Sequence, residues 1–160
     1  MAILVWESYA IVRYLAAAYC SGTLWPVDPR QRAEADQWSD WTATTFQAAW
    51  LRVFEAVVRT PVAQHDAGLI ARAKAEANRL FAMLDRRLAG RDFICGESLT
   101  YADIIVGVSM FRWMTMDIER LAMPNLEAWY RRLESRPAFQ RGVCVSFADM
   151  VGVPLPLPPG

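Results

Sequence analysis

A helical repeat of apolar residues between positions 66 and 90 constrains the fold more than any other feature of the sequence. Its apolar side chains recur at steps of three or four residues: Leu69, Ala73, Ala77, Leu80, Leu84 and Leu88. Asp66 precedes the repeat as a potential N-cap, and Gly90 follows it as a stop signal. This spacing predicts a long amphipathic helix.

A second long helix is predicted upstream. Asp28 stands at an N-cap position, Pro29 at the first helical position and Gln31 three residues after the cap, so a helix should begin here and continue to about Val58. A shorter helix is predicted to end near residue 20. One of its faces carries Ile11, Tyr14, Leu15 and Ala18 and needs an apolar partner.

The C-terminal half continues the helical pattern. Residues 100–113 are apolar nearly all round, which predicts a buried central helix. Residues 125–135 place Leu126, Trp129, Tyr130 and Leu133 on one side, and Pro137 marks a break. The tail from residue 149 is rich in proline and uncharged after Asp149, so we expect it to be extended over the surface or disordered. The one expected strand is the short apolar run of residues 1–6.

Composition narrows the function classes. The chain has 160 residues, 54% of them hydrophobic, which suits one ordinary domain or a little more. Its 17 Lys and Arg balance 17 Asp and Glu, which argues against binding of nucleic acid or of an anionic membrane surface. No apolar run approaches the ~20 residues of a membrane span and no secretory signal is evident, so we expect a cytoplasmic protein.

The metal-ligating and thiol residues are sparse. Cys20, Cys95 and Cys144 are widely spaced, and His65 is the single histidine. We therefore expect reduced thiols and no metal site. Cys95 is interpreted as a small buried hydrophobic residue, and His65 as part of an exposed loop between helices.

Two motifs carry specific side-chain chemistry. In "SLTYAD", Thr100 and Asp103 have the spacing of a capping box that starts the central helix, so a structural role is favoured over acid–base catalysis. In "LVWESYAIVRYLA", Glu7 and Ser8 stand just before a helix, whose N-terminus suits a carboxylate, while Glu7 can balance an ammonium. The alternative is that Ser8 merely caps its helix and Glu7 favours the helix dipole.

The segments "ES.AI.RYLA", "LWP.DP..RA.AD.W..W", "GESLTYADI" and "PNLEAWYRRLESRPAF", in this order, resemble the cytosolic glutathione transferases, most nearly the bacterial, theta-like members. The resemblance extends from about Leu4 to Phe147. It implies an all-α helical bundle of the C-terminal domain type, preceded by a remnant strand and helix of the thioredoxin-like half. The implied divisions are 1–22 for the remnant, 23–148 for the helical domain and 149–160 for the tail.

The resemblance also implies a function, in which the thiolate of the substrate glutathione attacks an electrophile. Glu7 and Ser8 correspond to the family's contacts with the γ-glutamyl end of glutathione, and Thr44 to a position that approaches glutathione across a dimer interface. The family's catalytic Ser, Tyr or Cys has no counterpart in these residues, so the resemblance implies no catalytic residue here and an inactive or impaired chain. The alternative is a non-catalytic helical module used for association.

The candidates for the electrophile pocket are Trp41, Thr44, Thr45, Arg112 and Trp113. Aromatic and hydroxyl side chains alternate along one predicted helix in "DWTATTFQAAW", "MFRWM" ends another, and both segments could line an apolar cleft. The alternative for the tryptophans is packing in a helical core. A homodimer through the first two helices is expected, since it would cover the apolar face of the first.

Overall fold

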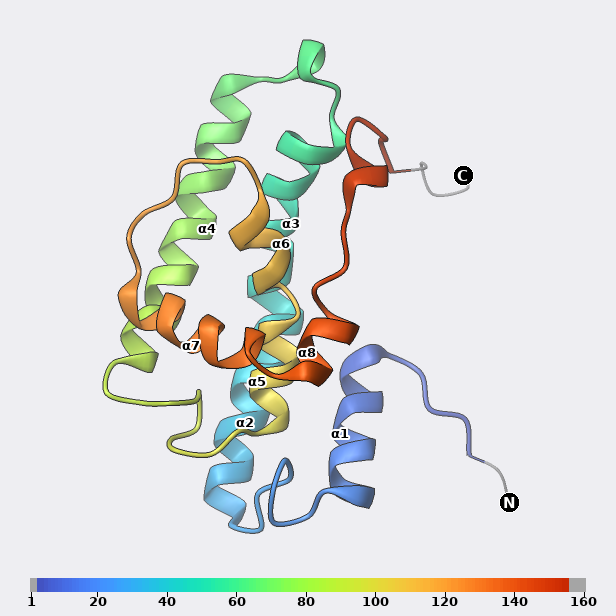
Figure 1. The fold of residues 1–160 in the computed structure, drawn as a ribbon, viewed down its shortest axis with the longest axis vertical. Coiled ribbons are helices and arrows are strands. Elements are labelled where there is room, and N and C mark those ends of the chain that lie inside the picture. The colour runs from blue at the N-terminus through green and yellow to red at the C-terminus, as the bar shows by residue number, and fades with distance from the viewer. Residues whose placement is uncertain (1–2, 156–160) are drawn as a thin grey trace.

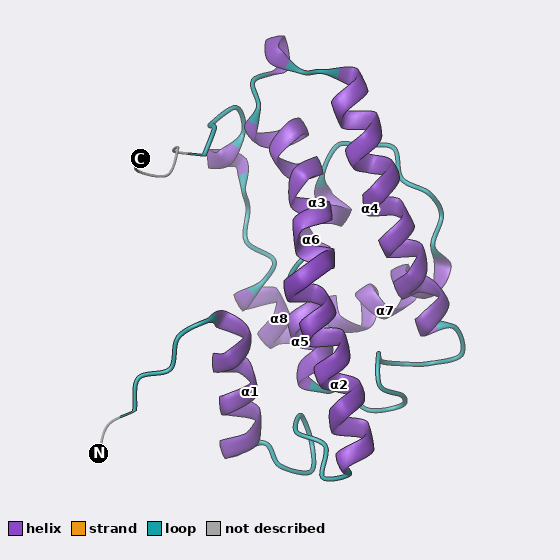
Figure 2. Ribbon diagram, turned by 180° about the vertical axis from the view of Figure 1, so that it is seen from behind, coloured by secondary structure: helices purple, strands orange, loops and turns teal. Residues whose placement is uncertain are grey.

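The computed structural model describes residues 3–155, which form the predicted all-α fold (Figure 1; Figure 2). Its α-helices are α1 (Ser8–Tyr19), α2 (Pro29–Trp41), α3 (Gln47–Phe54), α4 (Ala67–Leu88), α5 (Tyr101–Gly107), α6 (Met110–Thr115), α7 (Pro124–Glu134) and α8 (Pro137–Gly142). Over the described residues 3–155 the structure has no strand, and its only bridges are two isolated ones, Ser21 with Trp25 and Phe93 with Gly96.

The predicted helix over residues 28–58 is present, but it is not uniform. Two π turns, Thr42–Phe46 and Glu55–Arg59, interrupt the α geometry, so α2 and α3 form one continuous, irregular helix. Hydroxyl groups surround the first π turn: those of Ser39, Thr42 and Thr44 each donate to the carbonyl four residues earlier, at 2.7, 2.9 and 2.8 Å. Such bonds compete with the helical ladder and bend helices, which accounts for an irregularity here.

Helix α4 begins and ends as the sequence predicts. The carboxylate of Asp66 accepts from the amide of Leu69 at 2.9 Å, and Gly90 has a φ of 70° beyond the last helical residue. Ala77, Leu80, Leu84 and Leu88 are at most 2% exposed. Leu69 differs from the prediction, because it is 48% exposed on the first turn of the helix.

The predicted central helix is buried, but it divides into α5 and α6 at Val108 and Ser109. Gly107 stands just before this break, and a Cβ added there would lie 2.6 Å from Cδ1 of Leu133 in α7. The glycine therefore allows α5 to approach α7 closely. Glycine and serine are typical residues at helix kinks, and Gly107 and Ser109 flank this one.

The core lies between these helices and includes a residue of α1. Its largest fully buried side chains come from α4, α5, α6, α7, the π turn and the loop before α5: Trp129, Tyr101, Phe46, Phe81, Leu80, Leu84, Leu88, Ile94, Ile105, Met110, Leu126 and Leu133. Ala16 of α1 is 3% exposed within the same cluster. The face predicted on α7 is confirmed, since Leu126, Trp129, Tyr130 and Leu133 are all buried.

The two ends of the described chain differ from the expectations. Residues 3–6 form no strand, because a strand needs a paired neighbour and these residues lead to α1 as an open loop (Figure 1), while Met1 and Ala2 lie outside the described residues. Near the other end, the amide of Gly152 donates to the carbonyl of Val58 at 2.7 Å. The carbonyl of Val153 also accepts from the guanidinium of Arg59 at 3.1 Å, so the tail lies against the end of the second π turn at these two residues. The prediction for residues 156–160 falls outside the described part.

Candidate functional site

The corner before α1 has an unusual backbone. Glu7 has a φ of 69°, and no other residue except glycine has a positive φ in the described part of the chain. This conformation costs of order 1–3 kcal/mol for a residue with a side chain and is concentrated at functional sites. The carbonyl of Glu7 accepts from the amide of Ile11 at 2.9 Å, so the corner is tied into the helix that follows.

Ser8 is the first residue of α1 and not its cap. Glu7 holds the N-cap position, and no side chain accepts a hydrogen bond from this helix end. Both side chains are exposed. The corner thus exposes a hydroxyl, a carboxylate and uncapped N–H groups, which are the kinds of group that suit a carboxylate beside an ammonium.

Polar side chains hold α1 against the next helix. Arg13 pairs with Asp36 at 3.0 Å and also with Asp40. The hydroxyl of Tyr9, the residue after Ser8, donates to Oε1 of Gln47 at 2.5 Å. These contacts join the turn that carries the corner to α2 and to the first residue of α3.

The capping box is present at the start of α5. Asp103, which is fully buried, also gathers two groups from outside it: its Oδ1 accepts from the amide of Ile94 at 2.8 Å and from the indole of Trp129 at 2.9 Å. Its Oδ2 accepts from the amide and the hydroxyl of Thr100 at 2.9 and 3.0 Å. Burial raises the pKa of Asp103, and these four donors oppose that shift. The sequence pattern revealed only the Thr100 partner.

Tyr101, beside the box, has structural contacts as well. Its hydroxyl donates to Asp36 at 2.8 Å, its ring stacks on Trp25 at 5.1 Å, and burial raises its pKa. A phenol held in this way is a poor proton donor or acceptor near neutral pH.

The candidates for the electrophile pocket are spread over several environments. Thr44 and Thr45 are exposed on the first π turn, whereas the half-buried ring of Trp41 stacks on Phe46 at 4.7 Å. Trp113 belongs to the core, because it is 2% exposed and stacks on Phe81 at 4.2 Å. This burial favours the packing alternative for Trp113, whereas its role in lining the electrophile pocket stays a prediction.

Arg112 lies on another side of the same short helix, α6. Its guanidinium carbon is 5.9 Å from the ring centroid of Phe54, which in turn contacts Phe147 of the C-terminal segment. The arginine is only half buried. It is therefore open to a ligand on this side of the bundle.

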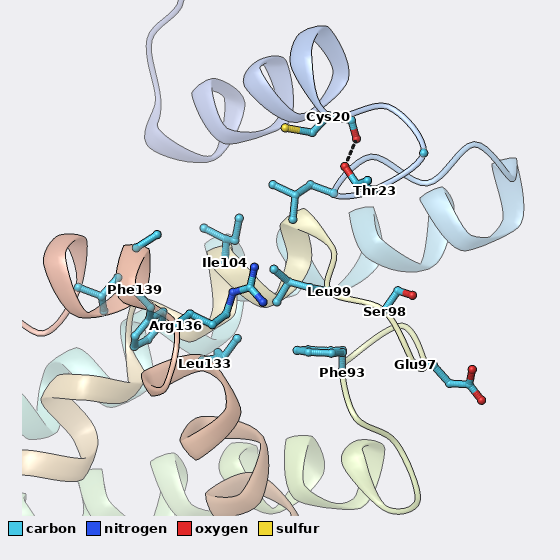
Figure 3. Close-up of a pocket in the computed structure, with 14 residues that line it drawn as sticks. Cys20, Thr23, Phe93, Glu97, Ser98, Leu99, Ile104, Leu133, Arg136 and Phe139 are labelled. Atoms are coloured by element: carbon cyan, nitrogen blue, oxygen red, sulfur yellow. Dashed lines mark hydrogen bonds between the residues drawn. The ribbon is translucent and has the colours of Figure 1, made fainter.

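A cavity of about 720 Å³ that sequence reasoning missed lies elsewhere (Figure 3). Its walls come from the α1–α2 loop, the loop before α5, α5 itself and the α7–α8 region, and they are mostly apolar: Cys20, Gly22, Thr23, Leu24, Phe93, Glu97, Ser98, Leu99, Ile104, Leu133, Arg136, Ala138, Phe139 and Val143. No motif joins these distant segments, so only the fold reveals the cavity.

The cysteine and histidine side chains show no catalytic arrangement. The three cysteines are free thiols of intermediate exposure. Cys95 was predicted to be buried, but it is only partly so. Burial nevertheless raises the pKa of Cys95 to about 11, which disfavours its thiolate at neutral pH. His65 lies in the loop before α4, with Nε2 3.0 Å from the carbonyl oxygen of Thr60.

Neither a metal cluster nor a membrane-spanning helix is found in residues 3–155. No group of three or more His, Cys, Asp and Glu side chains is placed there to hold a metal ion. None of the helices in this range is both long and apolar enough to cross a bilayer.

Comparison with known proteins identifies relatives of this fold. The family of the glutathione S-transferase C-terminal domain matches residues 41–137. Glutathione S-transferase GstB of Escherichia coli (strain K12) is 36% identical over 143 residues, which are 89% of this chain and 69% of the relative. Glutathione S-transferase D7 of Drosophila melanogaster is 32% identical over 131 residues, 79% of this chain and 55% of the relative.

Solved structures of glutathione S-transferases are similar to this fold. The theta class glutathione S-transferase from Xanthomonas axonopodis pv. citri, in its apo form, superposes with a TM-score of 0.86 at 44% identity, over 90% of this chain and 76% of that one. The same enzyme with glutathione bound also gives 0.86, over 91% and 70%. The chain described here therefore belongs to the glutathione S-transferase family.

Proposed function

We propose that the corner formed by Glu7 and Ser8 binds the γ-glutamyl end of glutathione. The observation that carries the proposal is the left-handed backbone of Glu7 next to an uncapped helix end. N–H groups that can bind an anion and the carboxylate of Glu7 therefore lie side by side. The γ-glutamyl group carries one carboxylate and one ammonium, so the two charges match. The Xanthomonas axonopodis pv. citri enzyme, whose structure is similar to that of this chain, was solved with glutathione bound.

In this proposal the reaction is attack of the glutathione thiolate on an electrophile, with glutathione as substrate. Residues 1–22 supply the anchor as part of a glutathione-binding unit, residues 23–148 form the helical domain and residues 149–160 the tail. Thr44, Thr45, Trp41 and Arg112 remain the proposed contacts of glutathione or the electrophile. For Trp113 we propose the packing alternative, because its side chain is buried.

The test examines separately the groups that would bind the carboxylate and the ammonium of the γ-glutamyl end. Ser8→Ala removes the hydroxyl, and Glu7→Gln removes the charge that faces the ammonium. Each change is expected to weaken glutathione binding by about three- to tenfold, measured by NMR titration. Glutathione without its α-ammonium (glutaryl-cysteinyl-glycine) should bind Glu7→Gln and the unaltered chain equally.

Glu119→Gln is the matched control, since Glu119 is an exposed carboxylate that lies 112 positions along the chain from Glu7. It should bind glutathione as the unaltered chain does. Equal glutathione binding by Ser8→Ala, Glu7→Gln and Glu119→Gln would disprove the proposed corner.

Association is proposed as well, on a separate observation. The face of α1 that includes Ile11, Leu15 and Tyr19 is exposed by 38, 47 and 74%, although these side chains are apolar or aromatic. We propose that a homodimer covers this face, as the alternative of a helical association module would also require. Sedimentation velocity at micromolar concentration should show a dimer that Leu15→Glu dissociates, whereas a monomer of the unaltered chain would contradict the proposal.

A further inference from the structure

Helix α1 is held against its neighbours in two different ways. It packs closely on α5, with Ala16 in the shared core. It reaches α2 and α3 through long polar side chains, with Arg13 bound to two carboxylates and Tyr9 bound to Gln47. The contact between Tyr9 and Gln47 is the one nearest the corner, because Tyr9 directly follows Ser8.

The first turn of α1 needs such a contact. No side chain caps this helix end, and the preceding Glu7 has a left-handed backbone. Uncapped helix ends fray, and a strained residue persists only where the surrounding structure holds it. Tyr9 is half buried against the core, so its ring and hydroxyl together can provide that restraint.

Gln47 is suited to the role of a fixed acceptor. It is the first residue of α3, and its own amide donates to the carbonyl of Thr42, the bond that closes the first π turn. The oxygen that receives the Tyr9 hydroxyl therefore belongs to the residue that ends the turn carrying Thr44 and Thr45. Through this one hydrogen bond, the corner before α1 and the π turn are linked.

We infer that Tyr9 and Gln47 are a positioning pair, whose hydrogen bond holds the Glu7 and Ser8 corner in its ligand-binding geometry relative to the π turn. This inference rests on the proposed function of the corner. Neither residue touches glutathione in this account. Tyr9 acts through Ser8, its neighbour in the first turn, and Gln47 acts through Tyr9.

The experiment uses the full chain with Tyr9→Phe and Gln47→Leu, singly and together. Two quantities are measured by NMR: the Kd for glutathione, and the hydrogen-exchange rates of amides in the first turn of α1 and in the core of α4. Tyr14→Phe is the matched control, because it removes the same hydroxyl from the same helix at a side chain that is 41% exposed.

Each single variant is expected to raise the Kd for glutathione by about three- to tenfold and to accelerate exchange in the first turn of α1. The double variant should resemble either single one, since both remove the same bond. Exchange in α4 should stay unchanged, which a general loss of stability would not allow. Gln47→Glu, which keeps an acceptor oxygen, should bind more tightly than Gln47→Leu.

Three results would overturn the inference, and they distinguish its failure from the failure of the proposed function. If the unaltered chain binds glutathione and Tyr9→Phe binds it equally well, the corner is a site but the pair does not position it. Additive losses in the double variant would lead to the same conclusion. If the unaltered chain binds no glutathione, the proposed function fails and the inference fails with it.

Discussion

Asp103 shows how one buried carboxylate can connect several segments. It receives hydrogen bonds from Ile94 in the preceding loop, from Thr100 at the start of α5 and from Trp129 of α7. All its partners are donors, so an ionised carboxylate fits the site and an amide does not. The residue therefore stabilises the meeting point of α5, α7 and the loop.

Asp103→Asn is expected to lower the free energy of unfolding by about 2–3 kcal/mol, because its NH₂ group would face donors and leave buried groups unpaired. Urea denaturation followed by circular dichroism measures this change. Asp92→Asn, in the loop before α5, is the control, since the Asp92 side chain is 64% exposed and its ion pair with Arg132 is long, at 3.8 Å. A loss equally small in both variants, within about 0.5 kcal/mol, would contradict the role of Asp103.

Gly107 has a steric role at the contact of α5 with α7. Gly107→Ala should improve helix propensity by about 1 kcal/mol, but it places a Cβ 2.6 Å from the buried side chain of Leu133. Overpacking of this kind costs about 1–3 kcal/mol, so we expect a net loss of stability. Thermal denaturation tests this, with Gly142→Ala as the control, because a Cβ at Gly142 meets no atom within 4 Å.

At the scale of elements, one helix supplies the cap of another. Met123, at the N-cap of α7, provides no side-chain bond, but Asp85 of α4 accepts from the amides of Asn125 and Leu126 at 2.9 Å each. Its other oxygen is 3.1 Å from the side-chain amide of Asn125. The carboxylate also complements the positive end of α7, so α4 and α7 stabilise each other.

Asp85→Ala is expected to cost about 1–2 kcal/mol and to accelerate amide exchange in the first turn of α7. Asp85→Asn keeps an acceptor oxygen without the charge, so it should lose less. Urea denaturation and hydrogen exchange measure the two effects. An identical loss for alanine and asparagine would show that the acceptor oxygen is not what holds the helix end.

At the scale of the whole molecule, the proposed function separates the binding of glutathione from the activation of its thiol. The hydroxyl of Ser8 lies at the proposed γ-glutamyl position, roughly a dipeptide length of ~7 Å from the cysteine sulfur, which is beyond hydrogen-bond reach. Hydrogen-bond activation of a nucleophile typically contributes about 100- to 10,000-fold. Under the proposed function, Ser8 is therefore expected to affect the affinity for glutathione and not the chemical step.

The polypeptide of residues 1–160 is accordingly expected not to accelerate conjugation of glutathione with a chlorinated dinitrobenzene above the uncatalysed rate. A theta-class thioredoxin-like domain fused ahead of Leu4 should produce measurable turnover. In that fusion, Ser8→Ala should raise KM for glutathione more than it lowers kcat. Robust turnover by residues 1–160 alone, abolished by changing one of these residues, would contradict the proposal that glutathione binding and thiol activation are separate.

The sequence by itself determined the helices and several of their ends. Caps at Asp28 and Asp66, the stop at Gly90 and the buried face of α7 follow from contacts within a few residues, which a local pattern records. The same holds for the box of Thr100 and Asp103. The order of motifs also pointed to the glutathione transferases, as the comparisons show.

Only the tertiary structure decided which side chains meet across the fold. The cap from Asp85 to α7, the bond from Trp129 to Asp103 and the contact of Tyr9 with Gln47 join residues 26 to 41 positions apart. The burial of Trp113 and the division of the central helix at Val108 likewise depend on packing. Local periodicity records which face of a helix is apolar, but it holds no information on the partner that covers that face, because the partner is chosen by the packing of the whole chain.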